Sequence, residues 1–183
     1  MKKVFIGLLI FIAIIIGLLA VGIKIGNVTI GRRTETLKAD QKSGIEQSQF
    51  YQQYLNTYKL IVMNYWATWC QPCVGEMPEL NQVMDKYKDE DIAFLSFSID
   101  TDSLKLAQFN NTKKFHFTDV TVENLAYINA IHNFLENRPL DEKISMQSVP
   151  ITYIIRNKKV LKKFDGSIEA AELTAAIDKA LEQ

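Results

Sequence analysis

Cysteine and histidine are scarce in this sequence, with two of each among 183 residues. A structural zinc site needs about four nitrogen or sulfur ligands. The spacing of the two histidines, His116 and His132, does not resemble that of a compact zinc finger. The sequence therefore predicts no metal site, and we interpret both histidines as structural or surface residues.

The sequence also lacks an excess of charge, because 21 Lys and Arg residues balance 21 Asp and Glu residues. This balance gives no electrostatic reason to expect binding to nucleic acid. No G-x-G-x-x-G motif is present, so nothing in the sequence indicates a nicotinamide or flavin site. We therefore expect no nucleic-acid partner and no bound cofactor of this kind.

Charge is absent from one long stretch, Val4 to Ile23, which contains 20 apolar residues. As a helix this stretch spans roughly 30 Å, the hydrocarbon thickness of a bilayer. The alternative is a cleaved signal peptide with a small-x-small site at residues 20–22, but the apolar part of such a peptide is usually shorter. We favour an N-terminal transmembrane helix within residues 1–25 that holds the protein on the cytoplasmic membrane as a single-pass protein.

Beyond this segment, the pattern of apolar residues predicts a polar stalk at 26–44 and one folded domain at 45–183. A short strand is expected in the stalk at Val28–Ile30. The predicted helices of the domain are 45–58, 70–88, 103–115, 123–137 and 168–181, and the predicted strands are 60–67, 92–99, 149–156 and 160–164. Alternating strands and helices predict an α/β sandwich, and a closing hairpin around 157–159 makes the sheet mixed.

In the helix predicted at 103–115, four apolar side chains are expected to face the core, namely Leu104, Leu106, Ala107 and Phe109.

Both cysteines occur in one Cys-x-x-Cys motif, Cys70 to Cys73, between a predicted strand and a predicted helix. Such a pair serves metal binding, a structural disulfide or redox exchange. Metal binding is disfavoured because too few ligands are available. A disulfide that closes so short a loop contributes little stability. Redox exchange is therefore the favoured interpretation.

The position of the motif predicts different roles for the two sulfur atoms. Cys70 lies at the first turn of the helix, where unpaired N–H groups and the helix dipole stabilise a thiolate. We predict that Cys70 is the more exposed thiol and the nucleophile, and that Cys73 resolves the mixed disulfide. Pro72 suits the first helical turn because its missing N–H costs little there. Trp69 is predicted to shield the site and to form part of a docking surface, or alternatively only to pack.

The stretches "WATWCQPC" and "SVPITYII", with Pro78 between them, resemble thioredoxin-fold proteins. More narrowly, "NYWATWCQPCVGEMPEL" resembles the membrane-anchored TlpA/ResA-like thiol–disulfide oxidoreductases. The resemblance covers roughly residues 45–183. It implies a thioredoxin-like three-layer sandwich in which helices flank a mixed central sheet. It also implies a redox-active Cys70–Cys73 disulfide that needs no other cofactor, and a reducing role on the periplasmic or extracellular side of the membrane.

The same resemblance assigns roles to residues outside the cysteine pair. Pro150 matches the family's cis-proline, which would present the backbone of Val149 to a partner peptide, although a proline that merely begins a strand is the alternative. Trp69 and Pro72 complete the implied docking surface. Glu76 matches the acid of the family's E-x-P stretch, and we expect it to take over proton transfer to or from Cys73, while a solvated helix carboxylate is its alternative. Asn64 stands where related thioredoxins carry a buried acid.

The partners implied by the resemblance are disulfide-bearing protein substrates and a membrane thiol protein that donates electrons, and cytochrome c maturation is one task typical of the family. A disulfide oxidase or isomerase with the same residues remains an alternative, and a reduction potential well above about −200 mV would favour it. A non-catalytic binding module is the second alternative. The segment 118–146 is longer than the usual connection, and either selects partners or packs against the domain.

Overall fold

The computed structural model describes residues 23–25, 28–30, 44–112, 115–143 and 148–182. The chain divides into two units, Met1–Lys38 and Ala39–Gln183. In the first unit, β1 (Ile23–Ile25) pairs in antiparallel fashion with β2 (Val28–Ile30), which confirms the strand predicted at 28–30. Ile23 therefore belongs to a strand and not to the end of a membrane helix.

Residues 4–22, which make up the rest of the predicted membrane span and include the alternative cleavage site, lie outside the described residues. Within the described part of the chain, no helix has both the length and the apolar character that a membrane crossing requires.

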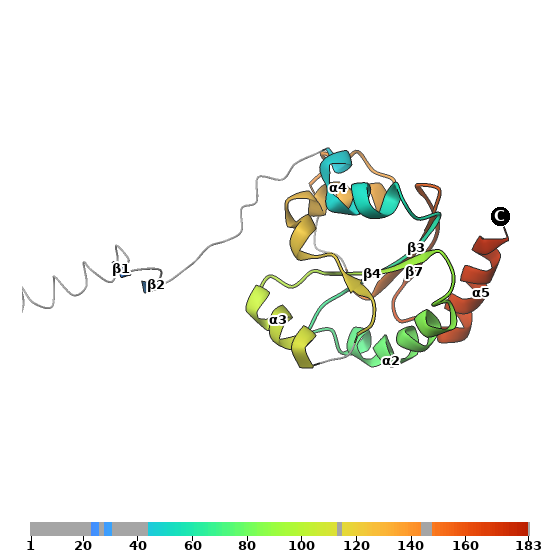
Figure 1. Cartoon of the computed structure of the whole chain (residues 1–183), viewed down its shortest axis with the longest axis horizontal. Helices are drawn as coiled ribbons and strands as arrows, with labels where there is room; N and C mark the ends of the chain where they lie inside the picture. The colour runs from blue at the N-terminus through green and yellow to red at the C-terminus, as the bar shows by residue number, and fades with distance from the viewer. Residues whose placement is uncertain (1–22, 26–27, 31–43, 113–114, 144–147, 183) are drawn as a thin grey trace, which may run out of the picture. The chain divides into compact units, whose positions relative to one another are not determined.

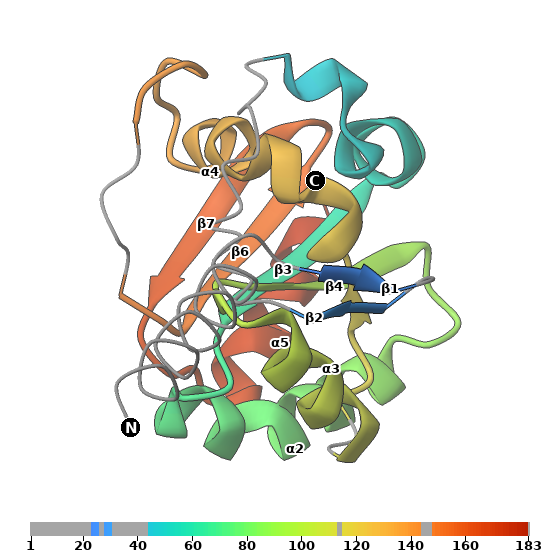
Figure 2. The ribbon, with the colours of Figure 1, turned by 90° about the vertical axis from the view of Figure 1, so that its left-hand side faces the viewer.

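The second unit is built on a five-stranded mixed sheet with the strand order β5-β4-β3-β6-β7 (Figure 2). Its strands are β3 (Leu60–Trp66), β4 (Ile92–Ser98), β5 (Thr118–Asp119), β6 (Ile151–Arg156) and β7 (Lys159–Asp165). β3, β4 and β5 run parallel, while β6 and β7 are antiparallel to their neighbours. The four predicted strands are confirmed to within two residues at each end. Periodicity did not predict β5 because it has only two residues.

Helices cover both faces of this sheet, which gives three layers (Figure 1). One face carries α2 (Gln71–Lys86) and α5 (Ala170–Leu181). The other carries four short helical segments, η1 (Ile45–Gln47), η2 (Phe50–Leu55), η3 (Val122–Tyr127) and α4 (Ile128–Leu135). A further helix, α3 (Ser103–Thr112), follows β4. The observed fold is the predicted thioredoxin-like α/β sandwich.

The position of β3 in the centre of the sheet explains why its sequence is almost uniformly apolar. All seven of its side chains are buried. Alternate residues of a strand point to opposite faces, so Ile61 and Met63 pack toward α4 while Leu60 and Val62 pack toward α2 and α5. Because both faces are covered, neither set of positions can be polar without loss of apolar burial.

Two predicted helices differ from the structure in their winding. Residues 45–58 form a 3-10 turn and a π-helical turn, and residues 122–135 form a 3-10 segment followed by α4. The buried side chain of Asn124 links the two regions, since it accepts a hydrogen bond from Phe50 N at 2.8 Å and donates one to Val120 O at 2.8 Å. A buried amide that bonds to neighbouring backbone groups competes with regular helical geometry.

The prediction for the inner side of α3 was wrong at two positions. Leu106 is buried and Phe109 is partly buried, but Ala107 is exposed and Leu104 is 74% exposed. A short helix that meets the core along one narrow stripe buries residues three apart, such as Leu106 and Phe109, and leaves the others in solvent.

The predicted hairpin between β6 and β7 is confirmed. Asn157 and Lys158 both have positive φ angles, of 49° and 62°. Two left-handed residues in succession make the tight turn whose twist matches that of the flanking strands.

Candidate functional site

The two cysteines lie where β3 passes into α2, and they are joined by a disulfide bond. Cys70 is the N-cap residue of α2, and its own N–H donates to Ala67 O at 3.1 Å. The exposed fraction is 5% for Cys70 and 1% for Cys73. Cys70 is thus the more exposed residue of the pair, as predicted, although both residues are buried.

The N-terminus of α2 supplies a donor to the sulfur of Cys70. The backbone N–H of Cys73 donates to Cys70 Sγ at 3.2 Å. Pro72 is exposed in the first turn, where no helical hydrogen bond is lost to its missing N–H. After reduction, this N–H and the positive end of the helix would stabilise negative charge on Cys70.

A hydrogen-bonded clamp holds the turn that precedes Cys70. Thr68 donates to Asp100 twice, through its N–H at 2.8 Å and through its hydroxyl at 2.7 Å. The hydroxyl of Ser98 donates to the same carboxylate at 2.6 Å. The clamp therefore ties the end of β3 to the end of β4. Next in the chain, Trp69 is 60% exposed, so it is not a core residue.

The segment before β6 lies against the first cysteine. The Val149–Pro150 peptide bond is cis, and the Val149 carbonyl oxygen lies 3.6 Å from Cys70 Sγ. Pro150 is buried, and its carbonyl accepts a hydrogen bond at 2.9 Å from the N–H of Gly166, a residue with φ of 91° that suits glycine. Residues 79 positions apart in the sequence thus meet at the disulfide.

Glu76 is buried within α2, only 6% exposed, so the solvated-carboxylate alternative is wrong. Its carboxylate accepts two hydrogen bonds, from Asn64 Nδ2 at 3.1 Å and from Ile168 N at 3.1 Å. Asn64 also donates to the hydroxyl of Thr152 at 3.0 Å. Burial raises the pKa of Glu76 to about 7, and the two hydrogen bonds only partly oppose this rise.

The raised pKa of Glu76 makes a testable prediction about stability. In the folded protein this carboxyl has a pKa of about 7, compared with 4.5 ordinarily, so between these values the folded state binds more protons than the unfolded chain. Its stabilising contribution is complete below about pH 4.5 and is lost as the pH rises through about 7. We expect this loss to reach about 3 kcal/mol, and Glu76→Gln to abolish it.

Chemical denaturation of the oxidised protein at a series of pH values measures this difference. The matched control is Glu90→Gln, at an exposed position beyond the end of the same helix, which should keep the wild-type pH slope. Identical slopes for the wild type and Glu76→Gln would contradict the assignment.

The structure brings most of the predicted site residues to one end of the sheet. Cys73 and Glu76 are three residues apart and both buried, so they share one side of α2. His116, by contrast, is exposed and lies 3.7 Å from Asp85, and His132 is buried against Tyr65 on the opposite face of the sheet. In the part of the chain that the structure describes, no three His, Cys, Asp or Glu residues are grouped to hold a metal ion.

Sequence analysis did not identify the clamp formed by Thr68, Ser98 and Asp100. The sequence shows only that polar residues follow two buried strands. This pattern is too common in proteins to indicate a functional site.

The sheet order, the disulfide at the start of a helix and the adjacent cis-proline together define a thioredoxin-like protein. In agreement with this class, residues 30–164 match the AhpC/TSA family, and the chain belongs to that family. A thiol-disulfide oxidoreductase ResA from Bacillus cereus is 35% identical over 57 residues, which cover 31% of this chain and 32% of the relative. The thioredoxin-like protein YneN from Bacillus subtilis is 25% identical over 123 residues, which cover 66% and 64%.

Solved structures agree on the fold. StoA from Bacillus subtilis superposes with a TM-score of 0.52 at 16% identity, over 66% of this chain and 83% of that chain. A thiol:disulfide interchange protein from Chlorobium tepidum gives a TM-score of 0.54 at 18% identity, over 67% and 80%. The match to the ResA relative spans about a third of that protein's length.

Proposed function

We propose that this chain is a thiol–disulfide oxidoreductase that reduces disulfides in protein partners. One observation carries the proposal: the chain's only two cysteines form a disulfide at the N-terminus of α2, where Cys73 N donates to Cys70 Sγ. The redox group is therefore the chain's own cysteine pair. The names of the ResA relatives support the same reaction class.

The reaction begins from the reduced pair. The Cys70 thiolate attacks one sulfur of the partner disulfide, and the other partner sulfur leaves as a thiolate. Cys73 then loses its proton and attacks Cys70 Sγ, which releases the second partner thiolate and forms the Cys70–Cys73 disulfide. Two electrons pass to the partner, and the chain must receive two electrons from a thiol protein before the next cycle.

In this proposal, Glu76 accepts the proton that the Cys73 thiol releases. A carboxyl with a pKa of about 7 accepts and returns a proton near neutral pH at little cost. Asn64 cannot take up a proton itself, but it orients the carboxylate through its 3.1 Å hydrogen bond. The Asn64 amide therefore orients the Glu76 carboxylate, and Glu76 remains the group that exchanges the proton.

Docking uses the groups beside Cys70. A partner peptide in extended conformation would pair with the backbone at Val149, next to Pro150, while Trp69 and Pro72, which flank Cys70 in the sequence, offer exposed contact area. The 3.6 Å separation of the Val149 oxygen from Cys70 Sγ means that a bound backbone lies close to the reacting atoms.

We propose further that the domain works outside the cytoplasm, held at the membrane by the apolar residues 4–22, and draws its electrons from a membrane thiol protein. Support for this location comes from the length of the apolar segment in the sequence. Reduction of a disulfide between the haem-attachment cysteines of apocytochrome c is one substrate role consistent with the proposal.

Trapping of mixed disulfides tests the proposed reaction. Cys73→Ser leaves the nucleophile in place and removes the resolving thiol, so partner proteins should accumulate as disulfide adducts of Cys70. Mass spectrometry of adducts released by a reductant identifies them. The double variant Cys70→Ser with Cys73→Ser is the control and should trap nothing. Absence of adducts with Cys73→Ser would count against disulfide exchange and in favour of the binding-module alternative.

A further inference from the structure

Large apolar side chains are exposed after each of the three parallel strands. Trp69 follows β3 and is 60% exposed, Leu104 follows β4 and is 74% exposed, and Val122 follows β5 and is 63% exposed. The carboxyl ends of parallel strands meet at one edge of a sheet, so the three side chains lie at the end that carries Cys70. Elsewhere in the described residues, Leu161 is the remaining exposed large apolar side chain, at 42%.

Hydrogen bonds join the loops that carry Trp69 and Val122. Thr68 is bound to Asp100, which also accepts from the hydroxyl of Ser98. The N–H of Ser98 donates to the hydroxyl of Thr121 at 2.8 Å. Thr68 and Thr121 directly precede the two apolar residues, so both side chains extend from backbone that is held to the end of β4.

The backbone of Leu104 is held in the first turn of α3. Its N–H donates to the carboxylate of Asp102 at 3.0 Å. Two residues further on, Leu106 packs in a cluster that includes Cys70, and the ring of Phe109 lies 5.0 Å from that of Trp66. The helix that carries Leu104 is therefore anchored against the disulfide region.

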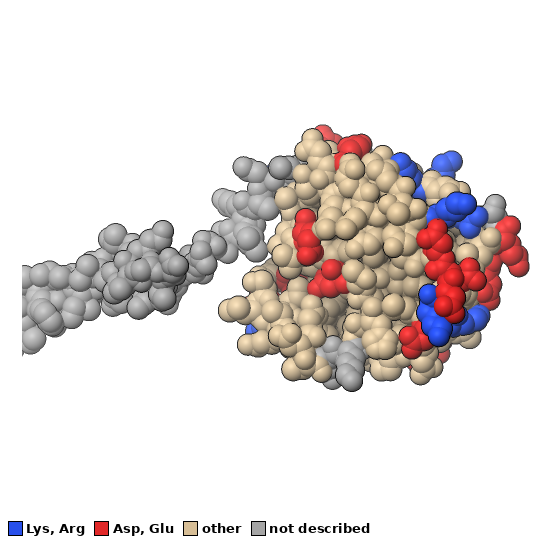
Figure 3. Space-filling model, in the orientation of Figure 1, with Lys and Arg blue, Asp and Glu red and all other residues tan. Residues whose placement is uncertain are grey.

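The charge around these residues indicates what kind of partner fits. Asp102 and Glu123 are exposed and lie within two positions of Leu104 and Val122 in the sequence, and Lys105 is the one base among the described residues that close to either of them. Figure 3 shows a largely uncharged surface with scattered acidic side chains on the α3 side, while most visible basic side chains gather toward α5. An apolar surface with an acidic rim repels anionic lipid and nucleic acid but accepts a polypeptide.

We propose that Leu104 and Val122, together with Trp69, form an apolar platform that binds the residues flanking the cystine of a protein partner. The proposal rests on the proposed function and adds a preference for partner disulfides with large apolar neighbours. Because Cys70 is only 5% exposed, a partner must press its chain against the surrounding loops to reach the sulfur. Apolar side chains on that chain would bury Leu104 and Val122 and gain affinity.

The platform also gives the segment 118–146 two roles. Tyr127, Ile131 and Leu135 are buried in the core that includes Tyr65 and Tyr153, whereas Val122 faces solvent beside the active-site end of the sheet. The segment therefore packs against the domain through its helices and contacts the partner through Val122.

Two peptides of equal length and charge, each joined to glutathione by a disulfide, test the platform. One carries Leu and Val beside its cysteine, and the other carries Ser and Asn. With the full-length chain we expect kcat/KM to favour the apolar peptide by about tenfold, and Leu104→Ser with Val122→Ser to reduce this ratio to near unity. Leu104→Ile with Val122→Ile should restore the preference.

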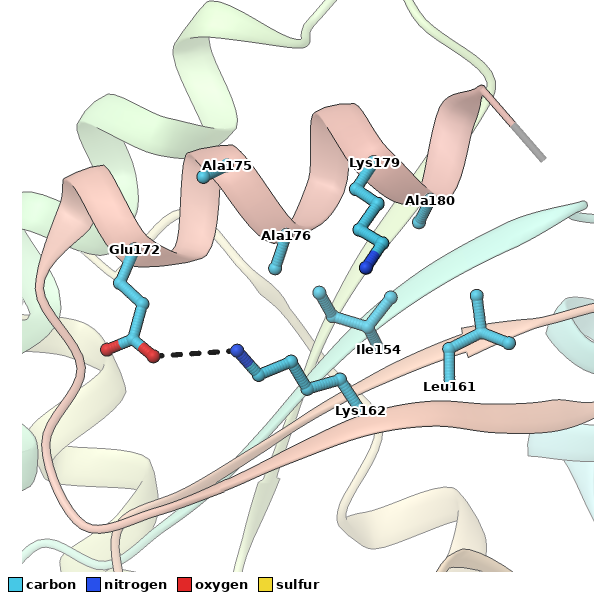
Figure 4. Close-up of a pocket in the computed structure, with 8 residues that line it drawn as sticks. All are labelled: Ile154, Leu161, Lys162, Glu172, Ala175, Ala176, Lys179 and Ala180. Atoms are coloured by element: carbon cyan, nitrogen blue, oxygen red, sulfur yellow. Dashed lines mark ion pairs between the residues drawn. The ribbon is translucent and has the colours of Figure 1, made fainter.

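Leu161→Ser is the matched control, since Leu161 lies in a separate groove of about 380 Å³ between β7 and α5, beside the 3.5 Å ion pair of Lys162 and Glu172 (Figure 4). This variant should keep the wild-type ratio. A ratio that Leu104→Ser with Val122→Ser leaves unchanged, or that Leu161→Ser lowers equally, overturns the platform while disulfide exchange stands. If the wild type reduces neither peptide, the proposed function fails, and the platform fails with it.

Discussion

Replacement of Cys70 by serine should lower the rate of disulfide reduction by at least about a thousandfold, the largest effect expected for a single substitution in this chain. A serine hydroxyl in place of the sulfur cannot form a mixed disulfide, so the first step of exchange is lost. The loss does not depend on folding contacts, because serine can accept the same hydrogen bond from Cys73 N. Turnover of glutathione disulfide with a chemical reductant measures the rate.

Cys73→Ser is the comparison that separates the roles of the two sulfur atoms. This variant should still form a mixed disulfide in one step, at a rate near that of the wild type, and should then stall. Alkylation of the reduced wild-type protein by iodoacetamide gives a second readout, in which Cys70 should react much faster than the 1% exposed Cys73. Equal alkylation rates would contradict the assignment of Cys70 as the nucleophile.

The second large effect is expected on stability. Phe97 is completely buried in β4, where its ring stacks on Tyr65 with centroids 5.1 Å apart and planes inclined by 9°. Tyr65 in turn meets Tyr153 edge to face at 5.9 Å. Phe97→Ala should lower the free energy of unfolding by about 3 to 5 kcal/mol, because it removes buried apolar area and leaves a cavity that the rigid sheet cannot close.

Such a loss is a large part of the roughly 5 to 15 kcal/mol that stabilises a typical domain. Denaturant titration followed by tryptophan fluorescence measures it. Leu104→Ala, at a 74% exposed position, is the control and should change the free energy of unfolding by less than about 0.5 kcal/mol. If the two variants were equally stable, the packing described for β4 would be incorrect.

Local pattern was sufficient to predict the elements that build the sheet. The apolar runs at 60–67 and 92–99 are central strands buried on both faces, and a chain segment of that kind has few other places in a folded protein. The start of α2 was also predictable, because Cys70 and Pro72 suit an N-cap and a first turn. Segments 45–58 and 123–137 were predicted as helices, but their winding was not predicted, since it depends on the hydrogen bonds of Asn124 to Val120 O and to the distant Phe50 N.

The sequence by itself therefore determined that the chain folds as a thioredoxin-like α/β domain and that its two cysteines lie together at a helix N-terminus. The α/β layering and the place of the cysteines follow from patterns within a few residues, where hydrogen-bond geometry and periodic burial act locally. The thioredoxin-like topology was implied by the resemblance of the motifs around Cys70 and Pro150 to that family. Only the tertiary structure decided that Glu76 is buried against Asn64, that Val149 lies against Cys70, and that Leu104 remains in solvent. These depend on how helices, loops and strands far apart in the chain pack against one another, and local sequence patterns do not specify that packing.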